Sequence, residues 1–401
     1  MNIEKIRQDF PILNNKMNGK PVVYFDSACM SLKPKQVVEA MNEYYFEYPA
    51  CAGRSSHKLG EMATRKVKEA RQILARFINA DEREIVFTRN TTEGINLLAN
   101  SLGLKDGDLV LTTDKEHNSN LIPWQRLVEK KGIRHKIVRS NDDGTFSLEK
   151  YEELIKGAKI ISMVHTSNLD GTTIPVEDVI RIAHENGALV ILDAAQSAPH
   201  QRIDVKNLDV DFLVFSGHKM LGPTGTGVLY GKYALLEKLE PFLVGGNTVE
   251  YSTYNGHVML KAPEKFEAGL QDYAGIIGLA EAVKYLQEIG FEKIKEHEYS
   301  LNRYITEEIK KHSKIKIIGP EDPALRSGII SFYIDGLDMH QIALMLDEMS
   351  NVMIRAGQHC VHSWFNDKNI KNSARASLYF YNTMKEAEMF INSLNKIMKI
   401  I

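Results

Sequence analysis

The sequence reads LVILD at residues 189–193, FLVFSG at 212–217 and GVLYG at 227–231. Each run is short and rich in branched or aromatic residues, as is typical of a buried β-strand. Elsewhere in the chain, segments with helical spacing of apolar residues separate further predicted strands. That alternation predicts a parallel or mostly parallel sheet with helices on both faces, which places the chain in the α/β class.

The same alternation extends back to residue 84. Further strands are predicted at 84–88 (EIVFT), 109–113 (LVLTT), 134–140 (RHKIVRS) and 159–165 (KIISMVH), which brings the sheet to seven strands. Residues 91–102, 120–132 and 176–187 carry apolar side chains at helical spacing, and Gly187 ends the last of these helices.

The pattern changes after about residue 275. A long helix over 273–312 is predicted to lead into a smaller α+β domain. That domain has predicted strands at 314–319, 327–334 and 352–357 and predicted helices at 338–349 and from Met384 onward. A chain of 401 residues is long enough for two domains. We expect a large domain over 16–285 and a small domain that combines 1–15 with 286–401.

The composition is that of an ordinary globular protein. Lys and Arg total 50 against 52 acidic residues, a balance that argues against a nucleic-acid or anionic-membrane partner. The first 16 residues lack the apolar core of a signal peptide, and the apolar runs are too short to span a bilayer. Cys29, Cys51 and Cys360 cannot form a disulfide framework, so we expect a cytoplasmic protein whose thiols are either reactive or small buried hydrophobes.

Lys219 is unusually placed for a surface lysine. It follows the apolar run at 212–217 and opens a Gly-rich turn with the sequence MLGPTGTG. A desolvated lysine amine is nucleophilic and commonly forms a Schiff base. The glycines match neither the Walker pattern nor the dinucleotide fingerprint, and a plain turn into an edge strand is the alternative interpretation.

Asp193 ends the strand at 189–193 and Gln196 follows it, at the edge where open α/β sheets bind ligands. A buried carboxylate there can keep a pyridine nitrogen protonated, which makes pyridoxal phosphate (PLP) an electron sink. Gln196 can donate to the phenolic oxygen of that cofactor. Lys219 lies at the end of a later strand. Asp193 and Lys219 together therefore indicate a PLP site more strongly than either residue alone.

Thr91 and Thr92 lie at a predicted helix N-terminus after a strand, where hydroxyls, free N–H groups and the helix dipole suit a phosphate. Asn90 and Glu93 have the spacing of a capping box, which is the purely structural interpretation of this stretch. His117 precedes the helix at 120–132 and offers a flat ring that could stack on a cofactor or serve only the fold.

Arg355 and Arg375 lie near strand ends of the small domain, and arginine binds carboxylates with two parallel hydrogen bonds. Cys360 follows His359 in a Gly-containing loop, a setting where a thiol can be exposed and reactive. A zinc site that uses Cys360 and its histidine neighbours is the alternative, although few other ligands have suitable spacing.

Taken together, these motifs resemble the cysteine desulfurases of the class V aminotransferase superfamily, in particular the SufS-like group, which includes selenocysteine lyases. The resemblance runs almost end to end through FDSA (25–28), TRNTTEGIN (88–96), EHNSNLIPWQ (116–125), HTSNLDGT (165–172), LDAAQS (192–197), FSGHKMLGPTGTGVLYG (215–231), RAGQHC (355–360) and RASLYFYN (375–382).

The resemblance implies a fold-type-I PLP-dependent transferase that forms a homodimer with its active site at the subunit interface. Lys219 would bind PLP covalently, Asp193 would pair with the pyridine nitrogen, and His117 would stack on the ring. The other implied contacts are Gln196 and Asn168 at the phenolic oxygen, Thr91, Thr92, Ser216 and His218 at the phosphate, Ala28, Arg54, Asn168, Arg355 and Arg375 at the substrate, and Cys360 as the sulfur acceptor, with no metal.

Four positions depart from the family pattern. Leu270 replaces a threonine that usually reaches the partner subunit's phosphate, and Arg54 lacks the histidine that usually precedes it. Cys29 and Cys51 lie beside substrate-pocket segments where alanine-like residues are more usual.

The expected activity is conversion of L-cysteine to L-alanine with transfer of sulfur to Cys360, which would supply iron–sulfur cluster assembly or other sulfur-containing molecules through an acceptor or scaffold protein. The alternatives are a selenocysteine lyase, a class V aminotransferase that needs no thiol, and a PLP-binding sulfur carrier with little turnover.

Overall fold

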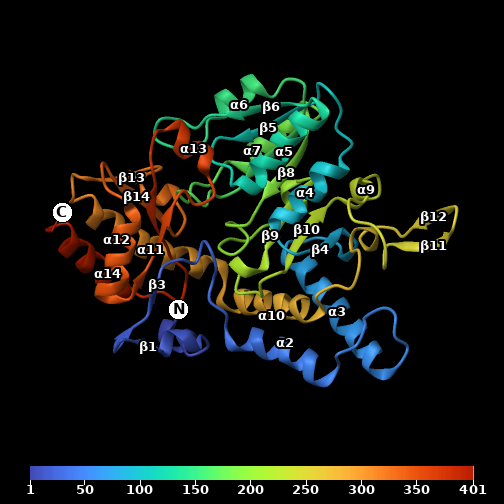
Figure 1. Cartoon of the computed structure of the whole chain (residues 1–401), viewed down its shortest axis with the longest axis horizontal. Coiled ribbons are helices and arrows are strands. Elements are labelled where there is room, and N and C mark those ends of the chain that lie inside the picture. Colours follow the sequence, from blue (N-terminus) through green and yellow to red (C-terminus); the bar gives the residue numbers. More distant parts are fainter. Residues whose placement is uncertain (401) are drawn as a thin grey trace.

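The computed structural model describes residues 1–400, and a seven-stranded sheet forms its centre (Figure 1). The strands are β4 (Ile85–Thr88), β5 (Leu109–Thr113), β6 (Arg134–Val138), β7 (Ala158–Val164), β8 (Leu189–Asp193), β9 (Phe212–Ser216) and β10 (Gly227–Gly231). Their order is β4-β10-β9-β8-β7-β5-β6. Only β10 runs antiparallel to its neighbours, so the predicted mostly parallel sheet is confirmed.

Helices cover both faces of this sheet, as predicted. Val190 and Leu192 of β8 join one core cluster, whereas Ile191 between them joins another, because successive strand residues point to opposite faces. The first cluster takes in α3 (Lys58–Phe77), α7 (Val176–Glu185) and α10 (Tyr273–Ile289). The second takes in α4 (Thr91–Ser101) and α5 (Asn118–Lys131).

A second, antiparallel sheet has the order β13-β14-β17-β16 and its own core cluster. Its elements are β13 (Ile315–Ile318), β14 (Ile329–Ile334), β16 (Arg355–Gly357) and β17 (Ser373–Ser377), packed with α11 (Phe291–Ile309), α12 (Met339–Ser350) and α14 (Met384–Ile397). The smaller α+β unit is therefore present, with β17 as a strand that the sequence pattern does not single out.

Two predicted elements are divided in the structure. The predicted strand 352–357 is two strands, because β15 (Val352–Met353) pairs in parallel with β3 (Val23–Tyr24) whereas β16 pairs with β17. The predicted helix 273–312 is two helices, α10 and α11. Gly290 separates them with φ +88°, a left-handed value that favours glycine. Of the four buried apolar residues of α11, Leu301, Ile305 and Ile309 belong to the core cluster of the second sheet, and Ile294 belongs to that of the large sheet.

The N-terminal segment packs against both units. Phe10 belongs to the core cluster of the large sheet, whereas Val23 and Phe25 belong to that of the small sheet. The division of the chain at residues 15/16 and 285/286 stays a prediction. In Figure 1 the N-terminus and β1 (Lys16–Met17) lie at the lower edge of the small unit.

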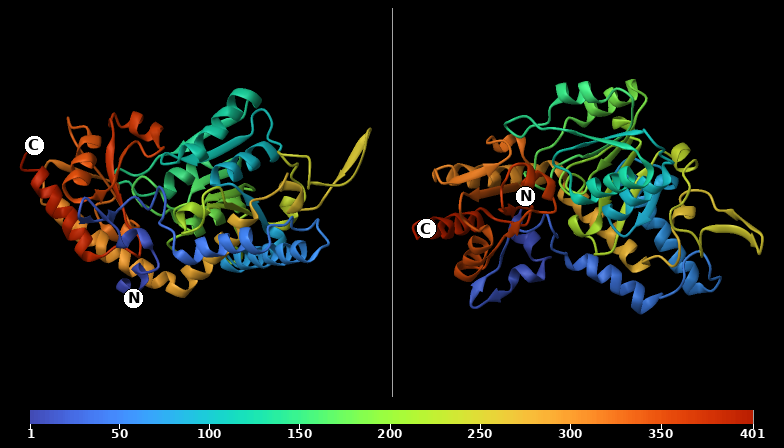
Figure 2. Two further views of the ribbon diagram at one scale, coloured as in Figure 1. Left: turned by 60° about the horizontal axis from the view of Figure 1, so that its bottom comes forward. Right: turned by 45° about the horizontal axis from the view of Figure 1, so that its top comes forward.

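The hairpin of β11 (Val249–Thr253) and β12 (Gly256–Met259) projects from the large unit at the end opposite the small sheet (Figures 1 and 2). The remaining elements are α1 (Ile3–Arg7), β1 (Lys16–Met17), β2 (Lys20–Pro21), α2 (Lys35–Glu47), α6 (Leu148–Leu154), α8 (Val205–Leu208), α9 (Tyr233–Leu236) and α13 (His362–Asp367), with short 3-10 turns between them. Within residues 1–400, no helix has the length and apolar character needed to cross a membrane.

Gly227 of β10 gives a test of the packing between sheet and helix. A Cβ added there would lie 2.8 Å from Asn90 Cα and 2.8 Å from Phe215 O, both backbone atoms that cannot move aside cheaply. We expect Gly227→Ala to lower the free energy of unfolding by about 1–3 kcal/mol, measured by urea denaturation. Gly256→Ala in the exposed hairpin, where nothing lies within 4 Å, is the matched control and should change it by less than about 0.5 kcal/mol. Equal stability of the two variants would contradict this packing.

Candidate active site

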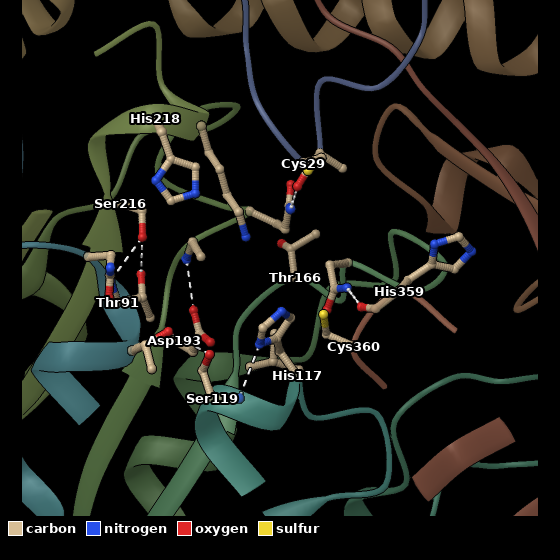
Figure 3. Close-up of a pocket in the computed structure, with 18 of the residues that line it drawn as sticks. Cys29, Thr91, His117, Ser119, Thr166, Asp193, Ser216, His218, His359 and Cys360 are labelled. Carbon is tan, nitrogen blue, oxygen red and sulfur yellow. Dashed lines mark hydrogen bonds between the residues drawn. The ribbon is translucent and has the colours of Figure 1, made fainter. Parts of the chain in front are cut away.

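A cavity of about 210 Å³ opens at the carboxyl ends of the large sheet, next to the small sheet (Figure 3). Open α/β sheets bind ligands at this edge. The sequence-predicted residues that line it are Ala28, Thr91, Thr92, His117, Asn168, Asp193, Gln196, Ser216, His218, Lys219, Arg355, Cys360 and Arg375. Those that the sequence did not assign to a site are Cys29, Asn90, Ser119, Val164, Thr166, Ala195 and His359.

Asp193 and Lys219 place a carboxylate and an amine in this cavity. Asp193 ends β8, and Lys219 ends the 3-10 turn that follows the neighbouring strand β9. Burial raises the pKa of Asp193 and lowers the pKa of Lys219, while the attraction between the two groups opposes both shifts. The backbone N–H of Ala195 donates to the Asp193 carboxylate over 2.9 Å.

The turn that carries Lys219 is held by the N-terminal segment. The carbonyl oxygen of His218 accepts three hydrogen bonds, from Ser31 N (3.0 Å), Ser31 Oγ (3.1 Å) and Lys33 Nζ (3.1 Å). Ser31 Oγ in turn accepts from the N–H of Leu221 over 2.7 Å. Burial lowers the pKa of Lys33 to about 7. The sequence pattern gave no signal for this clamp because its partners are almost 190 residues apart.

Hydroxyl groups gather at the N-terminus of α4. Ser216 Oγ accepts from the N–H of Thr91 over 2.9 Å and lies 2.8 Å from Thr91 Oγ1. Thr92 Oγ1 lies 2.7 Å from the hydroxyl of Ser119, which belongs to the first turn of α5. Helix N–H groups, the helix dipole and these hydroxyls together suit a phosphate.

The predicted capping box at this terminus forms only in part. Asn90 Oδ1 accepts from the N–H of Glu93 over 3.0 Å, as predicted. The Glu93 carboxylate instead accepts from the backbone N–H and the side chain of Arg89. The backbone N–H of Asn90 therefore lacks its expected partner in the box.

His117 caps α5, with Nδ1 accepting from the N–H of Ser119 over 3.1 Å. Burial, and then the nearby Lys219 amine, lowers its pKa to about 3. The neighbouring Glu116 accepts hydrogen bonds from Thr113, Asn120 and Val164, and so ties β5 to β7 beneath the ring. A neutral, fixed imidazole therefore faces the cavity.

Two arginines of the small sheet share one carboxylate. Arg355 and Arg375 are directly opposite each other in β16 and β17. Asp26 Oδ1 lies 3.4 Å from Arg375 Nη2, and Asp26 Oδ2 lies 3.9 Å from Arg355 Nη1. Arg375 Nη1 also donates to the carbonyl of Asn168 over 2.9 Å. This pair can take a carboxylate ligand.

Cys360 is presented by a strained but fixed loop. His359 and Cys360 have φ values of +48° and +60°, a left-handed backbone that costs energy in residues other than glycine. Asn168 Nδ2 donates to the His359 carbonyl and the N–H of Asn118 donates to the Cys360 carbonyl, both over 2.7 Å. The ring of His359 lies 2.8 Å from Ser373 Oγ. These contacts hold the thiol at the cavity wall.

Arg54 is the sequence-predicted site residue that this cavity does not include. It is exposed, and its side chain donates to Asn247 Oδ1 over 3.2 Å. Among residues 1–400, no group of three or more His, Cys, Asp or Glu side chains is placed to hold a metal ion.

The residues of the cavity fit PLP. The Lys219 amine can bind an aldehyde, the Asp193 carboxylate can pair with a pyridine nitrogen, and the hydroxyls at α4 can hold a phosphate. Buried polar atoms also lack partners here: Asn168 Oδ1, Gln196 Oε1 and Arg375 Nε. Such atoms are rare in a folded protein, and they indicate a polar ligand at this site.

The depressed pKa of His117 predicts how the cofactor-free protein responds to acid. The unfolded chain takes up this proton near pH 6.5 and the folded protein only near pH 3, so the folded protein loses stability as the pH falls through this window. We expect the His117 ring to stay neutral down to pH 5 in ¹⁵N NMR spectra, with His117→Gln to assign its signals. Protonation of His117 near pH 6.5 would contradict the buried setting.

Comparison with known proteins agrees with this geometry. Residues 23–390 match the family model "Aminotransferase class-V". A probable cysteine desulfurase of Pyrococcus abyssi is 41% identical over 99% of this chain and 98% of its own, and one of Synechocystis sp. is 42% identical over 97% and 94%.

The apo structure of the cysteine desulfurase from Thermococcus onnurineus NA1 matches with a TM-score of 0.95 at 41% identity, and covers 99% of this chain and 98% of its own. The cysteine desulfurase CsdA of Escherichia coli, in its S-sulfonic acid form, matches with a TM-score of 0.91 at 32% identity, over 100% and 99% of the two chains. This chain therefore belongs to the class-V aminotransferase family.

Proposed function

We propose that this chain is a PLP-dependent cysteine desulfurase, which converts L-cysteine to L-alanine and transfers the sulfur to Cys360 as a persulfide. One observation carries the proposal: the cavity that holds the Asp193 and Lys219 pair also holds a thiol and two arginines. An aminotransferase without a desulfurase role has no use for that thiol. Relatives named cysteine desulfurase, about 40% identical over the full length, support the proposal.

PLP, when bound, supplies an electron sink that stabilises negative charge on the Cα atom of an amino acid. Lys219 would bind the cofactor covalently, and Asp193 would keep its pyridine nitrogen protonated. The contacts proposed for the rest of the cofactor are His117 at the ring face, Gln196 and Asn168 at the phenolic oxygen, and Thr91, Thr92, Ser216 and His218 at the phosphate.

The small-sheet arginines bind and orient the substrate. Its carboxylate would bind Arg355 and Arg375, whose guanidinium groups Asp26 holds side by side, and Ala28 lies on the same cavity wall. The Lys219 amine would take the α-proton of the bound substrate. Burial, which disfavours the charged form of this amine, suits it to act as a base.

Cys360 receives the sulfur. Its thiolate attacks the substrate sulfur, an S–S bond forms as the Cβ–S bond breaks, and the carbon fragment leaves as alanine after taking up protons. Cysteine and one thiol thus become alanine and one persulfide, with no external oxidant or reductant. The loop contacts from Asn168 and Asn118 hold Cys360 for this attack.

We further propose that the protein is a homodimer. Apolar side chains exposed near the projecting hairpin offer a surface for a second copy: Phe242, Leu243, Val244, Tyr251 and Leu270. Arg54, which contacts Asn247 in the same region, would be covered with them. Leu270 has no side-chain donor for a phosphate, so the phosphate contacts would come from within one chain.

The direct test is incubation of the purified, PLP-loaded protein with L-cysteine, followed by measurement of alanine and sulfide. Parallel assays with L-selenocysteine and with a keto acid separate the alternatives. Alanine from cysteine supports the desulfurase. Product formed only from selenocysteine would indicate a selenocysteine lyase instead. Amino transfer to the keto acid without alanine from cysteine would indicate an aminotransferase.

Lys219 should be the lysine that carries the cofactor. After borohydride reduction of the PLP-loaded protein, peptide mapping should find the label on Lys219, because this amine alone faces Asp193 in the cavity of the described chain. Lys219→Ala should lose the label, whereas Lys33→Ala should keep it. A label on Lys33 would show that the neighbouring buried amine holds the cofactor.

Cys360→Ser should lower alanine formation from cysteine by at least 100-fold while the protein still binds PLP. Serine keeps the size of the side chain but cannot accept sulfur, and no contact of Lys219 or Asp193 depends on the thiol. Cys51→Ser, outside the cavity, is the matched control and should retain activity. If Cys360→Ser formed alanine as fast as the unmodified protein, a group other than Cys360 would be the sulfur acceptor.

A further inference from the structure

A second cysteine lines the same cavity as Cys360, and the reaction proposed above does not use it. Cys29 lies in the turn that follows β3, opposite the Cys360 loop in Figure 3. The N–H groups of Cys29 and Met30 both donate to the carbonyl of Asp26, over 3.1 and 3.2 Å. The N–H of Ala28 donates to Ser377 Oγ over 3.0 Å, which fixes this turn to the small sheet.

Cys29 is set among the cations of the site. The guanidinium of Arg355 donates to Cys29 Sγ through Nη1. A negative charge on Cys29 would also act on Arg375 and on the Lys219 amine, and the Lys219 amine responds in the same way to Cys360. Both sulfurs therefore lie within electrostatic reach of one amine. The Arg355 guanidinium is therefore placed to contact a sulfur carried on Cys29.

A persulfide on Cys360 extends this side chain at the wall of the cavity that Cys29 also lines. The S–S bond adds about 2 Å to the length of the Cys360 side chain. Departure of alanine leaves the substrate volume between the two cavity walls free. The outer sulfur and the Cys29 thiol then share that volume, with the arginines still in place to stabilise negative charge.

We propose that Cys29 is a second sulfur-accepting thiol, which takes the outer sulfur from the Cys360 persulfide. The Cys29 sulfur attacks the outer sulfur, a new S–S bond forms on Cys29, and the S–S bond on Cys360 breaks. Cys360 leaves as a thiolate and takes up the proton that Cys29 releases. One thiol and one persulfide become one persulfide and one thiol, so the step needs no oxidant or reductant.

This inference rests on the proposed desulfurase function and adds a storage step to it. Once Cys29 holds sulfur, Cys360 is free to react with a second cysteine before any acceptor arrives. One chain can then hold two transferable sulfur atoms. A chain without Cys29 can hold only one transferable sulfur atom.

The test uses the PLP-loaded protein with two equivalents of L-cysteine per chain, without reductant and under anaerobic conditions. After a rapid acid quench, we expect two alanines per chain, an intact mass increased by two sulfur atoms, and one added sulfur on each of the Cys29 and Cys360 peptides. Cys29→Ser should yield about one alanine and one added sulfur, a twofold drop. Cys51→Ser, outside the cavity, should match the unmodified protein.

The other outcomes are equally distinct. Sulfur only on the Cys360 peptide of the unmodified protein would overturn the inference and leave the desulfurase function intact. Two added sulfurs in Cys29→Ser would also overturn it, because they would mean a longer sulfur chain on Cys360. In the unmodified protein, a Cys29–Cys360 disulfide with release of sulfide would overturn it too. Sulfur on Cys29 in Cys360→Ser would show direct attack on the substrate and contradict the order of the two steps. No alanine from any variant would instead refute the proposed function itself.

Discussion

Burial of an acid and a base in one cavity is the constraint on which this structure depends. Removing a charged carboxylate or amine from water costs several kcal/mol, so Asp193 and Lys219 can be buried only where each stabilises the other or a ligand does so. The adjacency of β8 and β9 brings the two groups to the same edge of the sheet. The backbone N–H of Ala195 and the clamp on His218 then fix them in place.

The large sheet could be predicted because its signals are local. Six of the seven strands are short runs of mainly apolar residues, with β6 (RHKIV) as the exception. Asp193 ends β8, and Lys219 lies in the turn directly after β9. The small sheet was predicted less well, since its shorter strands owe their existence to distant partners. β15 pairs with β3, more than 300 residues away in sequence, and β17 is sandwiched between β14 and β16. The break at Gly290 was missed because apolar spacing continues on both sides of it.

The site divides in the same way. Motifs identify the lysine, the aspartate, the arginines and the thiol, because chemistry demands those residue types. They do not identify Asp26, Ser31 or Glu116, whose roles consist of contacts between segments remote in sequence. Nor do they reveal the left-handed backbone at His359 and Cys360. Arg54, expected at the substrate from resemblance, lies outside the cavity and contacts Asn247 instead.

The segment at residues 26–33 bears on the order in which the protein matures. Its Ser27 hydroxyl lies 2.8 Å from that of Tyr381, and its Ala28 N–H donates to Ser377, near the other end of the chain. The same segment clamps the turn of Lys219. During synthesis the large sheet can collapse once β10 has left the ribosome, but residues 26–33 cannot settle until β17 follows. The contacts of this segment with Ser377 and Tyr381 therefore form only after nearly the whole chain has been made.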